Sequence, residues 1–106
     1  MAIVAVSISP TGSAPASPDE GAGVSRYVAR ALAVVRSQSR VAYRLDPMFT
    51  TLEGDLDEIF ALVRQMQEAV FEAGAVRVGT VMKIDDRRDR EASMESKVRS
   101  VEDKLS

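Results

Sequence analysis

The stretch 43–57 constrains the fold more than any other part of the chain. It alternates apolar and polar residues, reverses at Asp46-Pro47, alternates again, and turns at Gly54-Asp55 into an amphipathic segment. This pattern predicts two strands joined by a tight reversal and followed directly by a helix. The second strand carries three polar residues, Thr50, Thr51 and Glu53, which either face solvent or belong to a site.

The remaining elements follow from the same two periodicities. Helical spacing of apolar residues predicts a helix of about four turns from Val24, a longer one after Gly54 that stops at Gly74, and a terminal one. Alternation predicts four strands, and the proline-rich and glycine-rich stretch 10–23 predicts an irregular loop. The expected strands are 2–9, 41–45, 48–53 and 76–84, and the terminal helix is expected at about 93–105.

This order predicts an α+β fold of the ferredoxin-like split βαβ type (βαββαβ), with a C-terminal helix after a four-stranded antiparallel sheet. The first strand is apolar on both sides, so we expect it, and the third strand beside it, to be central. Two helices cover one face of such a sheet. The other face needs a cover, and the sheet of another subunit is the simplest one.

Composition limits the chemistry that the chain can perform. The 106 residues fit a single domain spanning 1–106, and the net charge of −2 gives no general attraction to nucleic acid or anionic membrane. There is no cysteine and no histidine. We therefore expect no metal site, no cofactor and no enzymatic activity. The N-terminal apolar run lacks a preceding basic residue and no stretch is long enough to cross a bilayer, so a cytoplasmic location is expected.

Polar residues in the strands have two interpretations. Thr50, Thr51 and Glu53 are either a solvent-facing alternation or a polar notch for a small ligand, in which hydroxyls and a carboxylate supply directional hydrogen bonds. Ser7 and Ser9 share one face of the neighbouring first strand, so their hydroxyls could converge on that notch.

Two further features have an ordinary structural interpretation beside a functional one. Thr80 interrupts an apolar strand face, which a β-branched residue does without any function, or it belongs to the same notch. The alternating charges of 85–90 lack aromatic interleaving and calcium-loop spacing. They favour a self-paired, solvated or intersubunit ion network over a metal or nucleic-acid site.

Several segments together resemble a known family. They are 24–28, the strand 43–45, Pro47-Met48-Phe49-Thr50 followed by Glu53-Gly54, and the run 77–89, with 93–98 in the terminal helix. On these segments the chain resembles the small thiamine-binding proteins, the YkoF-like family. The resemblance implies a ferredoxin-like subunit that assembles into dimers or tetramers through sheet faces and binds thiamine or its hydroxymethylpyrimidine moiety without a reaction.

The resemblance also implies where that ligand binds. Glu53 would pair with a charged or amine-bearing group, the hydroxyls of Thr50 and Thr80 would donate or accept hydrogen bonds, and Met48 or Phe49 would form apolar walls. Ser7 and Ser9 complete the expected ligand-binding set.

The chain departs from the family pattern at two positions. Phe49 stands where the family has glycine, and Gln67 stands where the family has histidine. Three interpretations therefore stay open: a non-enzymatic binder, a structural or regulatory homo-oligomer that has lost the ligand site, and an enzyme acting through Glu53 and Lys83. Each is expected to bind neither nucleic acid nor membrane.

Overall fold

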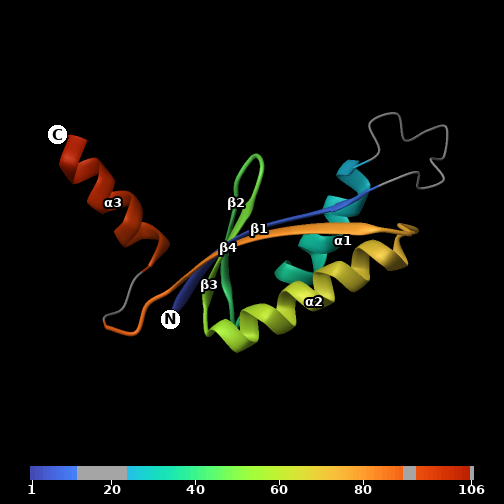
Figure 1. The fold of residues 1–106 in the computed structure, drawn as a ribbon, viewed down its shortest axis with the longest axis horizontal. Helices are drawn as coiled ribbons and strands as arrows, with labels where there is room; N and C mark the ends of the chain where they lie inside the picture. The colour runs from blue at the N-terminus through green and yellow to red at the C-terminus, as the bar shows by residue number, and fades with distance from the viewer. Residues whose placement is uncertain (12–23, 90–92, 106) are drawn as a thin grey trace.

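The structure is a computed structural model that describes residues 1–11, 24–89 and 93–105. Its sheet has four strands, and three helices complete the described chain (Figure 1). The elements are β1 (Ala2–Pro10), α1 (Val24–Arg36), β2 (Ala42–Leu45), β3 (Thr50–Gly54), α2 (Leu56–Glu72), β4 (Val78–Asp86) and α3 (Met94–Leu105).

The strand order is β2-β3-β1-β4, with every neighbouring pair antiparallel. This order confirms the predicted α+β, ferredoxin-like fold and the central positions of β1 and β3. Helices α1 and α2 pack together on one face of the sheet (Figure 1). No helix in the described ranges is both long and apolar enough to cross a membrane.

Strand β1 shows how the sequence sets the two faces. Its even-numbered residues Ala2, Val4, Val6 and Ile8 are buried under the helices, and its odd-numbered residues lie on the open face, as the alternation predicts. The β1 core residues join apolar residues of α1 and α2, among them Val35, Ile59 and Val70, which are completely buried.

Strand β1 is longer than its partner β3. Its first five residues pair with β3, from Ala2 opposite Gly54 to Val6 opposite Thr50, whereas its whole length pairs with β4. The ladder to β4 continues through the bond from Thr11 N to Arg77 O, which is 2.9 Å long. The second half of β1 therefore has a neighbour on one side only.

The strand boundaries differ from the predicted ones by one or two residues. Pro10 belongs to β1, because its position faces the side on which β3 is absent and its missing N–H costs no ladder bond. Met48 lies in the turn before β3, with 81% of its surface exposed, and Val76 precedes β4. The predicted loop at 10–23 otherwise falls outside the described residues.

Helix α2 begins and ends at recognisable caps. The Asp55 side chain accepts a hydrogen bond from Glu58 N at 3.1 Å, which satisfies one of the free N–H groups of the first turn. Gly74 follows the helix with a φ of 116°, a conformation that suits glycine. Both features agree with the predicted start and stop of this helix.

Helix α3 lies apart from the other helices in Figure 1 and contains no buried residue. An ion pair between Lys97 and Asp85 links it to β4. The Lys97 hydrogen bond and charge hold the pKa of Asp85 below its usual value. Nearby, Arg87 pairs with Asp89 at 2.7 Å and Arg88 with Asp86 at 3.8 Å, so these four residues pair within the run while Asp85 pairs outside it.

Candidate functional site

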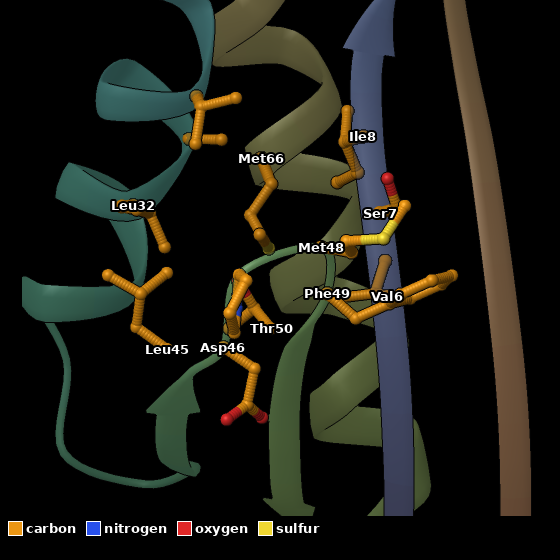
Figure 2. A pocket seen from close by; sticks show the side chains of 13 residues that line it. Val6, Ser7, Ile8, Leu32, Leu45, Asp46, Met48, Phe49, Thr50 and Met66 are labelled. Carbon is orange, nitrogen blue, oxygen red and sulfur yellow. The ribbon is translucent and has the colours of Figure 1, made fainter. Parts of the chain in front are cut away.

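A pocket lies between α1, the second half of β1 and the turn that joins β2 to β3 (Figure 2). Its empty volume is about 500 Å³, including space open to solvent. The lining is mostly apolar, and Ser7, Asp46 and Thr50 supply its polar side chains. The apolar lining residues are Val6, Ile8, Val28, Ala31, Leu32, Leu45, Pro47, Met48, Phe49 and Met66.

The pocket exists because β3 begins two residues after Met48. The turn closes with a bond from Asp46 N to Phe49 O at 3.1 Å, and Thr50 is then the first residue to pair with β1. Beyond that pair, no strand fills the space beside β1. The side chains of Met48 and Phe49 extend from the turn toward β1, while Leu32 and Met66 border the space from the two helices (Figure 2).

Thr50 is the buried polar residue of this site. It is 8% exposed and lies opposite Val6, on the face that the helices cover. Its side chain brings a hydroxyl, which both donates and accepts hydrogen bonds, to a predominantly apolar lining.

Asp46 puts a negative charge at the rim. Its Oδ2 accepts a hydrogen bond from Thr51 Oγ1 at 3.1 Å, and its carboxylate points away from Leu32 and Met66 (Figure 2). The residue is exposed, so the carboxylate keeps its contact with water. A cationic group at the mouth of the pocket would meet this charge.

The structure divides the seven predicted ligand-binding residues among three places. Met48, Phe49, Thr50 and Ser7 line the pocket. Because Ala5 pairs with Thr51 and Ile3 with Glu53, Ser9 and Glu53 lie on the open face, away from Thr50. The expected convergence of the serine hydroxyls with Thr50 on one face is therefore not found.

Thr80 lies on the helix-covered face of β4, opposite Ile8, but it does not line the pocket. Its Oγ1 accepts a hydrogen bond from Gln67 Nε2 at 2.8 Å. Gln67 is the residue that stands in place of the expected histidine. The hydrogen bond joins α2 to β4. Gln67 and Thr80 are polar residues at an otherwise apolar contact, and each is the partner of the other.

The open face does not assemble a catalytic pair. Glu53 of β3 lies opposite Ile3, and Lys83 of β4 lies opposite Ala5, so β1 separates the two side chains. Among the ion pairs of the described residues, none joins Glu53 to Lys83. Within the described ranges, no group of three or more acidic residues could hold a metal ion.

Sequence reasoning missed the part of the lining that α1 and α2 supply. Val28, Leu32 and Met66 belong to the apolar spacing that predicts the two helices, and Asp46 was predicted only as a turn residue. The apolar stripe of α1 was visible in the sequence, but a stripe does not tell which residues face a neighbouring element and which face a gap.

The fold and the pocket define the class: a ferredoxin-like α+β protein with a mostly apolar pocket between its sheet and a helix. The comparison with protein families agrees with it. The family model described as "Thiamine-binding protein" matches residues 4–102, and the chain belongs to that family.

Relatives with known sequences and structures support the same assignment. The UPF0045 protein YqgV of Bacillus subtilis is 40% identical over 104 residues, which cover 95% of this chain and 94% of YqgV. A crystal structure of a Methanocaldococcus jannaschii protein is 34% identical with a TM-score of 0.80, covering 95% of each chain.

A more distant structure shows the fold alone. It comes from Thermotoga maritima, is 21% identical, has a TM-score of 0.73, and covers 94% of this chain and 97% of its own. That protein is described as a candidate thiamine biosynthesis or salvage protein.

Proposed function

We propose that this protein binds thiamine, or its hydroxymethylpyrimidine moiety, in the pocket between α1, β1 and the β2–β3 turn. The observation that carries the proposal is the pocket itself, with apolar walls, the Thr50 side chain in its lining and Asp46 at its rim. Its cavity volume is about 130 Å³, below the about 300–1,000 Å³ of typical small-ligand pockets, so a bound ligand would also occupy the space at the mouth of the pocket.

The chemistry of thiamine suits these groups. A pyrimidine is flat, and the side chains of Met48 and Phe49 offer it apolar contact. Its ring nitrogens and amino group need hydrogen-bond partners, of which Thr50 is one. The thiazolium of thiamine carries a fixed positive charge, and the exposed carboxylate of Asp46 is the nearest acidic group to the pocket lining.

Membership of the thiamine-binding protein family supports this ligand class. The proposal includes the absence of a reaction and of a separate cofactor, because the chain has no histidine or cysteine and Glu53 and Lys83 are not in contact. It also includes the cytoplasmic location and the assembly into dimers or tetramers that the sequence predicts.

Calorimetric titration with thiamine and with hydroxymethylpyrimidine tests the proposal. We expect heat from at least one ligand and its loss in Val28→Phe, which puts a ring into the pocket from α1. Ala33→Phe adds the same ring at an exposed position of α1 and serves as the matched control. Absence of heat and of thermal stabilisation with both ligands at millimolar concentration would contradict the proposal.

Phe49 favours one second candidate, a structural or regulatory homo-oligomer whose ligand site has been lost. Its ring lines the pocket at the position where the related proteins are expected to have glycine. If Phe49→Gly binds thiamine while the parent protein does not, the ring blocks the site and this second function is the better one. If the parent binds and Phe49→Ala binds less tightly, the ring is a wall of the site.

A further inference from the structure

The pocket contains a polar feature that no side chain provides, the edge of β1 that no strand of the described residues pairs with. Bonds from Thr11 N to Arg77 O and from Arg87 N to Met1 O extend the β1–β4 ladder at both ends. In an antiparallel ladder the bonded residues alternate, so the odd-numbered residues of β1 bond to β4. The even-numbered residues then direct their N–H and C=O groups toward β3.

Ile8 and Pro10 are the even-numbered residues of β1 for which β3 provides no partner, and of the two Ile8 has an N–H. Val6 pairs with Thr50, the first residue of β3. The same register would set Met48 opposite Ile8, but Met48 lies in the turn and is 81% exposed. Ile8 lines the pocket. In Figure 2 the pocket lies between β1 at Ile8, helix α1 and the β2–β3 turn.

A residue at an open strand edge offers a donor and an acceptor side by side. In a complete ladder the residue on the opposite strand would bond to both groups: its C=O would accept from the N–H, and its N–H would donate to the C=O. A ligand that replaces that residue must carry the same two functions on one edge. Among flat heteroaromatic rings, a ring nitrogen next to an exocyclic amino group has this arrangement, which is a cyclic amidine.

We propose that the main-chain N–H and C=O of Ile8 are the specificity-determining groups of the pocket and bind the cyclic amidine edge of an aminopyrimidine ring. This inference rests on the proposed function and states how the site selects its ligand. The ring nitrogen accepts from Ile8 N–H, and the amino group donates to Ile8 C=O. Met48 and Phe49 contact the ring.

The open edge is too short for a peptide strand. Ser7 and Ser9 use their backbone groups on β4, and Pro10 has no N–H. One residue therefore supplies both groups of the edge, whereas strand addition depends on a row of main-chain bonds. The edge thus suits a small ring and does not suit a polypeptide partner.

A ligand series tests the inference. Hydroxymethylpyrimidine is compared by calorimetry with its analogue in which the 4-amino group is replaced by hydrogen and with its 4-oxo analogue. A lost or reversed hydrogen bond at a buried group lowers affinity by about 10-fold to 100-fold. We expect both analogues to bind that much more weakly. Equal affinities for all three would overturn the inference while leaving the proposed function intact.

A pair of variants tests Ile8 itself. Ile8→Pro removes the N–H without removing a ladder bond, and Ile8→Ala loses a similar part of the side chain while keeping the N–H. We expect Ile8→Pro to bind hydroxymethylpyrimidine at least about 10-fold more weakly than Ile8→Ala. Equal affinities in the two variants would overturn the inference.

Amide hydrogen exchange on the unaltered protein avoids any effect of substitution on folding. Without ligand, the Ile8 amide should exchange faster than the Val6 amide, which pairs with Thr50. Saturating hydroxymethylpyrimidine should slow exchange at Ile8 and leave Ser7 and Ser9 nearly unchanged. Unchanged exchange at Ile8 in the bound protein would overturn the inference, and failure of every ligand to bind would overturn it together with the proposed function.

Discussion

Thr50 has a place in the sheet and, in the proposed function, a role in binding. On the buried face of β3 it precedes Leu52 and Gly54, and among the described residues it is the buried polar one. A valine there would fit the strand equally well and would pack against the same neighbours. Its hydroxyl is therefore explained better by a ligand than by the stability of the sheet.

Thr50→Val separates those two roles. The substitution exchanges a hydroxyl for a methyl group of nearly the same shape, so we expect the free energy of unfolding to change by less than about 1 kcal/mol. The affinity for hydroxymethylpyrimidine should fall about 10-fold, because its polar partner is lost. Thermal unfolding and calorimetric titration measure the two effects. Unaltered affinity would show that the Thr50 hydroxyl does not contribute to ligand binding.

At the scale of elements, helix α2 holds the β1–β3 layer in place, and its first turn depends on Asp55. The Asp55 side chain accepts from Glu58 N at 3.1 Å, while Asp57 lies one residue into the helix. We expect Asp55→Ala to lower the free energy of unfolding by about 1 kcal/mol, because the N-cap bond is lost. Asp57→Ala keeps that bond and should cost less. Equal losses in urea unfolding of the two variants would contradict the role of the cap.

The link between β4 and α3 should depend on pH. Lys97 holds the pKa of Asp85 below its usual value. A carboxyl group with a lowered pKa in the folded protein stabilises the fold above its unfolded pKa, about 3.9, and this contribution is lost as the pH falls through the folded value. The link should therefore be intact at neutral pH and weaken in acid.

The pKa of Asp85 can be followed by the NMR shift of its side-chain carbonyl. We expect Lys97→Ala to raise that pKa toward the usual aspartate value, since the hydrogen bond and the positive charge are both lost. Arg88→Ala removes a neighbouring charge that pairs with Asp86 and is the control. A similar rise in both variants would indicate general charge effects instead of a specific pair.

Most elements could be predicted from the sequence, but the site only in part. Alternation in β1 and the stripe of α2 each follow from a single segment, and both were found. The faces of two neighbouring strands depend on their register, which no single strand contains. That is why Thr50 was expected beside Ser9. Predicting the pocket also required knowing how far β1 extends beyond β3. That length depends on where the turn at Met48 ends.

At the scale of the whole molecule, α1 and α2 cover one face of the sheet and leave the other open among the described residues. Val81 is 59% exposed on the open face, and Ile3 and Ala5 lie beside it. Glu53 and Lys83 share this face, so its apolar part is a small area on β1 and β4. The assembly predicted from the sequence would bury that area.

Val81→Lys tests that assembly. A charged side chain in an apolar interface lacks a partner, so we expect the variant to be monomeric while the unaltered protein is a dimer or tetramer. Val76→Lys, at another exposed position outside the strands, should leave the assembly intact. Light scattering at micromolar concentration measures the mass. A monomeric unaltered protein would contradict the prediction.

The proline at the end of β1 has a consequence for solubility. An unpaired strand edge attracts other strands, and long open edges are common starting points of aggregation. Here the stretch beyond Val6 ends at Pro10, which cannot donate to a neighbouring strand. The proline thus reduces the number of main-chain donors that the open edge of β1 offers to the strand of another molecule.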